Sequence, residues 1–375
     1  MARFYVLHEG YSPCSASSVR LLGLLKELSA RQIDTNVVFF RVDENHSKAP
    51  DLPKISYRYY GTKLAKCHSR VKNLAYLYWY SYRFRKTIIE GDIVYAYGCD
   101  RLVTLLTKKR INLFQERTEH PMVRHLFGTN VHKYLIACKK LSGLFVISSS
   151  LKQYYVSNGV DENKIHTINM TVDPSRFIGL KKTVMVDRYI AYCGQPMTEK
   201  DGVDQLIRAF SLVVRAIKGI KLVIIGKMPS DIESSYLFQL GRELGIENNI
   251  LFTGIVPFNN LPQTLKDSCL LALTRPNNIQ AKYGFPTKLG EYLLTENPVV
   301  VTAVGDIPLF LEDNKSAYLV ESDVPELIAD KIIFALSHQE LSREIGLRGK
   351  EVALKSFNSQ IEAEKIINVI FNNTY

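Results

Sequence analysis

The chain has 375 residues, 46% of them hydrophobic, and a formal net charge of +11. This length exceeds what one core usually organises, so we expect two domains, each with a well-buried core. No apolar run approaches the roughly 18–20 residues of a transmembrane helix, and the N-terminus lacks a signal-peptide layout. The six cysteines show no paired spacing for zinc or redox chemistry. We therefore expect a cytoplasmic protein whose contact with any membrane is peripheral.

The positive charge is concentrated in the first half of the chain. Residues 1–182 contain 29 Lys/Arg and 14 Asp/Glu, whereas residues 183–375 contain 19 and 23. Segment 54–86 holds nine basic residues, no acidic residue and many aromatic ones. This mixture fits anionic lipid headgroups at the inner face of the plasma membrane. It also fits single-stranded nucleic acid or a plain solvated surface. We favour the membrane and expect no nucleic-acid partner.

Short β-branched or aromatic runs alternate with helical patterns along the chain, which predicts parallel sheets covered by helices. A periodic helix is predicted at residues 19–28. The first half has six runs of strand character, at residues 3–7, 35–42, 93–97, 113–116, 143–148 and 164–168. We expect residues 1–180 to form a Rossmann-like domain.

The second half repeats this alternation after a polar stretch at residues 179–183. Strands are predicted at residues 189–193, 221–225, 250–253, 270–273 and 299–302. Helices are predicted at residues 203–216, 235–244, 261–266, 325–336 and 341–356. We expect a second Rossmann-like domain over residues 181–357. Residues 358–375 begin with a capping box and form an apolar helix that we expect to pack back on the first domain. Two such domains predict a cleft lined by the carboxyl ends of strands.

The most informative motif is GFPTKLGEYL, at residues 284–293. Its glycine-proline turn opens a helix, so unpaired backbone N–H groups and the positive end of the helix dipole are available to a phosphate. Glu291 lies inside that helix, near enough to accept hydrogen bonds from the hydroxyls of a sugar. An ordinary helix start with Pro286 at its first position gives the same pattern. Both interpretations remain open on this motif alone.

A second motif, YCGQPMTEKDGVDQLIRAF at residues 192–210, combines a strand, a glycine turn, a polar loop and a helix. Lys200 stands before the helix and could neutralise a diphosphate, and Gln195 could donate a further hydrogen bond. Many strand-to-helix loops look similar. The presence of GFPTKLGEYL in the same domain makes a phosphate site the stronger interpretation.

These motifs, together with the strand and turn sequences at residues 221–226 and 253–257, resemble family 4 glycosyltransferases of the GT-B fold. The resemblance covers most of the chain and is most specific over residues 185–357. It implies a retaining, metal-independent glycosyltransferase of cell-surface glycan biosynthesis. Such an enzyme moves a sugar from a nucleoside-diphosphate sugar to a lipid-linked or polysaccharide acceptor. The resemblance implies that residues 1–180 bind the acceptor and residues 181–357 bind the donor. The donor-binding residues implied by the resemblance are Gly10, Gln195, Lys200, Gly254, Ile255, Phe285, Thr287, Lys288, Leu289 and Glu291.

In this assignment Lys200 binds the diphosphate and Glu291 binds the ribose. The turn around Gly254 and Ile255 holds the base, and backbone groups around 285–288 bind the phosphates. The loop at Gly10 approaches the diphosphate from the first domain. Helix dipoles and Lys200 then stabilise the leaving group, because the sequence has no Asp-x-Asp pair for a metal.

Three positions depart from the family pattern. Tyr283 stands where a first glutamate is usual, Gln195 replaces an arginine, and Thr118 replaces a histidine. The neighbouring Glu119 and His120 are the catalytic candidates, as a base or a hydroxyl-binding group, and we favour Glu119. A solvated loop explains these two residues equally well.

Two rival functions remain open. One is a GT-B nucleotide-sugar epimerase, and the other is a non-catalytic nucleotide-binding module. A dinucleotide oxidoreductase is disfavoured, because no G-x-G-x-x-G follows the first strand.

Overall fold

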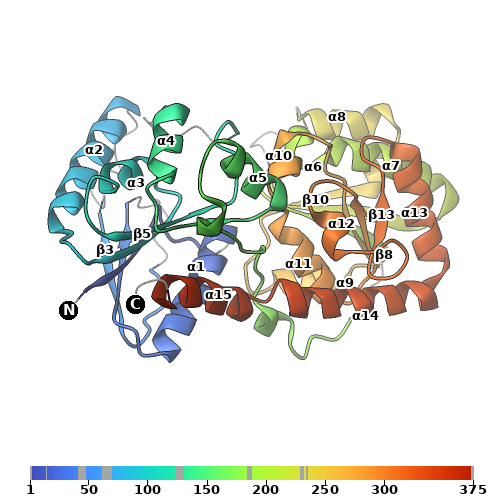
Figure 1. The fold of residues 1–375 in the computed structure, drawn as a ribbon. Helices are drawn as coiled ribbons and strands as arrows, with labels where there is room; N and C mark the ends of the chain where they lie inside the picture. Colours follow the sequence, from blue (N-terminus) through green and yellow to red (C-terminus); the bar gives the residue numbers. More distant parts are fainter. Residues whose placement is uncertain are drawn as a thin grey trace. The chain divides into compact units, whose positions relative to one another are not determined.

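The computed structural model describes residues 2–13, 15–40, 48–60, 70–123, 130–183, 188–228, 232–233 and 235–372. The chain divides into two compact units, and each is described by itself (Figure 1). Unit 1 comprises residues 1–171 and 359–375, and unit 2 comprises residues 172–358. The first unit thus ends before the expected position at residue 180.

Unit 1 is built on a seven-stranded sheet in which every paired strand is parallel, with strand order β3-β2-β1-β4-β5-β6-β7. Apolar and β-branched runs supply its buried central strands. The strands are β1 (Phe4–His8), β2 (Thr35–Phe39), β3 (Ile55–Tyr59), β4 (Ile93–Tyr97), β5 (Asn112–Arg117), β6 (Gly143–Val146) and β7 (Ile165–Thr167).

Helices cover both faces of this sheet. The strand order reverses at β1, so right-handed crossovers place α1 on one face and α2, α3 and α4 on the other (Figure 1). The first helix begins where the Ser15 side chain accepts a hydrogen bond from the N–H of Ser18. The helices are α1 (Ala16–Ala30), α2 (Arg70–Thr87), α3 (Asp100–Leu106), α4 (Val131–Cys138), α5 (Ser149–Ser157) and α15 (Ser359–Asn372), with a 3₁₀ turn η1 (Glu162–Lys164).

The basic and aromatic segment 54–86 contains a strand that the sequence analysis missed. Edge strand β3 alternates half-buried and exposed residues, and the rings of Tyr57 and Tyr59 stack on Phe39 at 6.2 and 5.1 Å. Part of the segment's aromatic content therefore serves the core of unit 1. Residues 61–69, with Lys63 and Lys66, lie outside the described residues.

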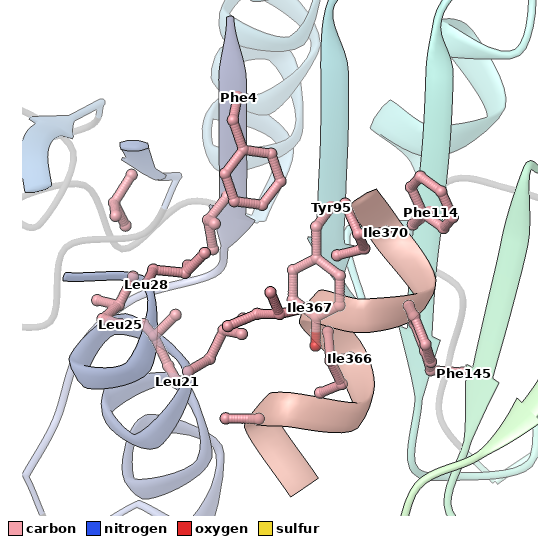
Figure 2. Close-up of a cluster of buried hydrophobic side chains, with 14 of the residues drawn as sticks. Phe4, Leu21, Leu25, Leu28, Tyr95, Phe114, Phe145, Ile366, Ile367 and Ile370 are labelled. Atoms are coloured by element: carbon pink, nitrogen blue, oxygen red, sulfur yellow. The ribbon is translucent and has the colours of Figure 1, made fainter. Parts of the chain in front are cut away.

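Helix α15 completes the core of unit 1 from the far end of the sequence. Its isoleucines Ile366, Ile367 and Ile370 face α1 and the sheet (Figure 2). Gly23 of α1 allows this packing, because a Cβ there would lie 2.8 Å from the Cβ of Ser359. The same helix carries Glu362, which is fully buried and accepts a hydrogen bond of 2.9 Å from the backbone N–H of Asn169.

Unit 2 is built on a six-stranded parallel sheet with strand order β10-β9-β8-β11-β12-β13. Five of its strands coincide with predicted ones, and the short edge strand β13 was not predicted. The strands are β8 (Arg188–Cys193), β9 (Ile220–Ile225), β10 (Ile250–Gly254), β11 (Leu270–Leu273), β12 (Val299–Thr302) and β13 (Tyr318–Val320).

The helices of unit 2 also cover both faces of its sheet. Helix α13 packs against α7, and α14 packs against α11 (Figure 1). The helices are α6 (Thr198–Asp201), α7 (Val203–Ala216), α8 (Tyr236–Glu243), α9 (Leu261–Asp267), α10 (Ile279–Tyr283), α11 (Thr287–Leu294), α12 (Ile307–Phe310), α13 (Pro325–Ser337) and α14 (Gln339–Ser356), with 3₁₀ turns η2 (Pro174–Phe177) and η3 (Glu247–Asn249). Among the described residues, no helix combines the length and the apolar character needed to cross a bilayer.

Candidate functional site

Glycines bring three backbone segments together where β8, β9 and β10 end. The N–H of Gly194 donates to the carbonyl of Ile225 at 2.8 Å, and the N–H of Gly226 donates to the carbonyl of Gly254 at 2.9 Å. A Cβ at Gly226 would collide with the carbonyl oxygen of Gly194, and φ of Gly226 is +152°. Only glycine fits there. The carboxyl edge of the sheet therefore presents closely spaced backbone, as a phosphate site requires.

Lys288 of α11 extends its ammonium group over this edge. Its Nζ contacts the Asp201 carboxylate at 2.5 Å and the Tyr192 hydroxyl at 3.0 Å. The Tyr192 hydroxyl in turn donates to Asp201 at 2.7 Å. A Cβ at Gly194 would collide with Nζ of Lys288. Because an ammonium has three N–H donors, these contacts leave one for a ligand.

The electrostatics of this group favour an anionic ligand. Burial lowers the pKa of Lys288, and the nearby Lys200 ammonium lowers it further, against the opposing effect of Asp201. Lys200 directly precedes Asp201, the residue that Lys288 contacts, so the two lysines predicted for the donor site lie in the same part of unit 2. A diphosphate placed between them would relieve their repulsion and replace lost hydration.

Glu291 lies on the same helix and is held by an arginine. Arg176 of η2 forms an ion pair with Glu291 and donates to the carbonyl of Phe258 at 3.0 Å. Burial raises the pKa of Glu291, and Arg176 opposes this effect. Both Glu291 and Lys288 influence the thiol of Cys193 at the end of β8, whose pKa burial raises to about 12. The carboxylate is therefore oriented beside the lysines.

A second glycine contact fixes the loop that carries Lys200. Gly202 has φ of +61°, and a Cβ there would collide with the carbonyl oxygen of Thr274. The Thr274 hydroxyl donates to the carbonyl of Gly202 at 2.8 Å. Nearby, the buried Arg275 donates to the carbonyl of Lys200 at 3.3 Å. The Lys200 backbone is thus positioned by the end of β11.

The residues around the start of α11 divide into core and surface. The Phe285 ring packs against Phe310 and Phe357 at 5.5 and 5.4 Å, and the Leu289 side chain is fully buried. The N–H of Leu289 already donates to the carbonyl of Pro286 at 3.1 Å. What this turn can offer a phosphate is therefore backbone N–H groups near Thr287, which begins the helix without a side-chain cap.

The other predicted donor residues have differing positions. Gln195 is exposed, and its carbonyl accepts from Tyr192 at 3.0 Å. Gly254 ends β10 with φ of +70°, followed by Ile255, whose exposed fraction is 68%. Gly10 belongs to unit 1, where it follows β1 and its N–H donates to Nδ1 of His8 at 3.3 Å.

The catalytic candidates follow β5 in unit 1. His120 is buried, its Nδ1 accepts the N–H of Met122 at 3.2 Å, and its ring meets the edge of Tyr154 at 4.2 Å. Burial and Arg117 lower the pKa of His120. Glu119 is half-buried. The hydroxyl of Thr118 lies 3.2 Å from that of Tyr97.

The sequence analysis missed the partners of the predicted residues. Asp201 and Tyr192 lie inside a motif that was quoted, yet no role was assigned to them. Arg176 lies in a stretch to which the sequence analysis assigned no role. Tyr283, the unusual residue before the GFPTKLGEYL turn, lies under the ammonium of Lys282 at 5.5 Å. Among the described residues, no group of three or more His, Cys, Asp or Glu is placed to hold a metal ion.

Comparisons with known proteins point to a family for the second half of the chain. Residues 187–338 match the family described as glycosyl transferases group 1. The chain is 30% identical over 166 residues to N-acetyl-alpha-D-glucosaminyl L-malate synthase of Bacillus anthracis, covering 44% of this chain and 40% of the relative. It is 24% identical over 244 residues to poly(ribitol-phosphate) alpha-N-acetylglucosaminyltransferase of Staphylococcus aureus, covering 64% and 46%. The chain spans about half the length of the curated relatives it matches.

Solved structures show the fold of the whole chain. HepE from Anabaena, solved in complex with UDP, matches with a TM-score of 0.73 at 16% identity, covering 99% of this chain and 100% of that one. The two parallel α/β units, the matched family and this structural likeness lead to one conclusion. Residues 187–338 match the group 1 glycosyl transferases, and the chain has the GT-B fold.

Proposed function

We propose that this protein is a retaining glycosyltransferase that moves a sugar from a nucleoside-diphosphate sugar to a lipid-linked or polysaccharide acceptor. The observation that carries the proposal is the placement of Lys288 and Glu291 on α11, with Lys288 in contact with Asp201 next to Lys200, at the carboxyl edge of the unit 2 sheet. The match to group 1 glycosyl transferases covers this region. HepE, which shares the fold, was solved with UDP.

Each of these residues has a role in the proposed reaction. Negative charge develops on the diphosphate as the bond to the sugar breaks, and the two lysines and the start of α11 stabilise it. Glu291, oriented by Arg176, accepts hydrogen bonds from ribose hydroxyls. The acceptor hydroxyl attacks on the face that the diphosphate leaves. We propose that no divalent cation is required, on the basis of these cations and the lack of an Asp-x-Asp pair.

The group that activates the acceptor is proposed to be Glu119 rather than His120. A general base must reach the hydroxyl that it deprotonates. His120 is only 6% exposed, and one ring nitrogen already accepts a backbone N–H. Glu119 is the more accessible of the two.

Calorimetric titration with UDP, GDP and ADP tests the donor site. We expect one base to bind selectively, and we expect Lys200→Ala and Glu291→Ala to weaken that binding roughly tenfold or more, as for lost hydrogen bonds to charged groups. Lys218→Ala, at an exposed position beyond α7, is the matched control. Failure of all three nucleotides to bind would contradict the proposal.

Turnover with the corresponding nucleotide sugars separates the remaining functions. A transferase consumes the donor only with an acceptor or slowly with water, and EDTA leaves its rate unchanged. An epimerase converts the nucleotide sugar into an isomer without any acceptor. A non-catalytic module binds the nucleotide and leaves the sugar attached.

A membrane-bound acceptor is favoured by the outer surface of α2. Tyr78, Trp79 and Tyr82 have exposed fractions of 46%, 49% and 52%. Arg83 lies over the Trp79 ring at 4.8 Å, and Lys86 lies over the Tyr82 ring at 4.7 Å. Aromatic rings beside cations suit the interface of an anionic membrane. We propose that this surface docks at the inner face of the plasma membrane.

The single tryptophan of the chain makes this docking measurable. Vesicles of phosphatidylcholine and phosphatidylglycerol should shift the fluorescence of Trp79 to shorter wavelength, and vesicles of phosphatidylcholine alone should not. Replacing Arg83, Arg85 and Lys86 by Gln should weaken binding, since each cation contributes about 1 kcal/mol. An unchanged spectrum with anionic vesicles would refute docking through α2.

A further inference from the structure

Unit 2 contains a cavity at the edge of the sheet opposite the donor residues. Its volume is about 520 Å³. It lies where β8, β11 and β12 begin, beside the ends of α9 and α13 and the first turns of α14. In a parallel sheet all strands begin at the same edge, so this cavity is separate from the carboxyl edge that carries Lys200 and Lys288. The polar lining residues are Lys181, Lys182, Arg188, Lys266, Glu296, Asn297, Gln339, Ser342 and Arg343.

The lining contains five cations and one carboxylate. That carboxylate is fully used, because Glu296 pairs with Lys266 at 2.6 Å and with Lys350, outside the lining, at 2.6 Å. Lys266 also donates to the carbonyl of Thr295 at 2.7 Å, and Lys182 donates to the carbonyl of Ser268 at 2.8 Å. Capping of helix ends therefore explains Lys266 and Lys182.

The remaining cations have no such explanation. In the described part of the chain, Lys181, Arg188 and Arg343 have no carboxylate within the 4.0 Å of an ion pair. Burial lowers the pKa of Lys182, and the cations of Lys266 and Arg188 also lower it, against the raising effects of Cys269 and Asp267. Among the described residues, the lining of the cavity thus carries positive charge that no carboxylate of an ion pair neutralises.

Part of the lining of the cavity is apolar. Leu180, Leu336 and Leu347 line the cavity together with Cys269, Pro298 and Ala335. A bare inorganic anion would leave this surface uncovered. A molecule with both an anionic group and a short apolar part would fill it, because burying apolar area is favourable by about 25 cal/mol per Å².

We propose that this cavity is a second binding site, distinct from the donor site, for a phosphate-bearing molecule with an apolar portion. Guanidinium groups bind phosphate through paired N–H donors, and Arg188 and Arg343 supply two such groups at the mouth of the cavity. Both a free organic phosphate and the headgroup of an anionic lipid have this chemistry. The site does not depend on the proposed transferase activity.

Calorimetry on the full chain with butyl phosphate tests the proposal. Saturating UDP is present throughout, so that the donor site is occupied. We expect butyl phosphate to bind more tightly than inorganic phosphate, and Arg188→Gln with Arg343→Gln to weaken binding at least about tenfold. Arg242→Gln, at an exposed position on α8, should leave this affinity unchanged.

Vesicles distinguish the two sources of phosphate. Sedimentation with phosphatidylcholine vesicles containing phosphatidic acid is measured with Arg83, Arg85 and Lys86 replaced by Gln, so that docking through α2 does not contribute. It should be lost on adding the double substitution if a lipid is the ligand, and should be unchanged if the ligand is free. Arg343→Gln alone, at an exposed position on α14, keeps the test valid if the double variant unfolds. Equal butyl phosphate affinity in parent and variants, or no binding to the parent, would overturn the proposal.

Discussion

Replacing Lys288 should affect both the stability of unit 2 and its binding of a nucleotide. The Lys288 ammonium is paired with Asp201, whose side chain is only 3% exposed. Breaking a buried pair by removing one partner costs about 3–5 kcal/mol, because a charge is left uncompensated. The Tyr192 hydroxyl still donates to Asp201 and the buried Arg275 stays 3.9 Å from it, so we expect Lys288→Ala to lose about 3 kcal/mol, the lower end of that range.

Differential scanning calorimetry measures this loss. For a unit of this size, 1 kcal/mol shifts Tm by about 2–4 °C, so about 3 kcal/mol corresponds to roughly 6–12 °C. Lys200→Ala is the comparison, because the partly exposed Lys200 lacks such a buried partner among the described ion pairs. We expect it to weaken nucleotide binding with a Tm change below about 2 °C.

The double variant Lys288→Met with Asp201→Asn identifies the cause. If an isolated carboxylate is responsible, removing its charge should restore most of the lost Tm while nucleotide binding stays weak. A Lys288→Ala variant with the parent Tm would refute the reasoning. A double variant less stable than Lys288→Ala would refute the assignment of the cost to Asp201.

Three further predictions concern stability. Gly202→Ala should lose more free energy of unfolding than Gly219→Ala. Gly219 has a similar backbone geometry but lies in open space, so its replacement should cost about 1–2 kcal/mol. Urea unfolding compares the two variants, and equal losses would contradict the collision at Gly202. Ile370→Ala should cost about 2–5 kcal/mol, and Ile361→Ala, at a position 37% exposed on the same helix, less than about 1 kcal/mol. Burial and a nearby arginine lower the pKa of His120. The contribution of His120 to stability is therefore present above about pH 6.5 and is lost as pH falls. His120→Gln should flatten the dependence of Tm on pH, and an unchanged slope would exclude the effect.

The central strands of both sheets could be predicted because their chemistry is local. Runs such as 299–302 are apolar and β-branched, as a strand buried on both faces must be. Strand β3 has no such apolar run. Its residues alternate between half-buried and exposed, and its tyrosines and arginine look like those of the basic and aromatic segment around it. Pairing with β2, which no local pattern encodes, makes it a strand.

Some residues of the candidate site could be predicted from local sequence, and others could not. Lys200, Lys288 and Glu291 stand in motifs whose spacing indicates a phosphate site. Arg176 reaches Glu291 from 115 residues away, and only the folded chain brings them together. The lining of the cavity beside Arg343 likewise comes from segments that are distant in the sequence. A single sequence therefore offers no signal for this cavity.

The return of α15 to unit 1 has a consequence for how the protein is synthesised. Unit 2 is continuous in sequence, so its residues can all meet as soon as residue 358 has left the ribosome. The core of unit 1 lacks Ile366, Ile367 and Ile370 until after that point. Unit 1 therefore stays incomplete while unit 2 folds, and the apolar surface between α1 and its sheet stays uncovered during that time. Chaperones that bind nascent chains should meet this protein chiefly through its first 171 residues.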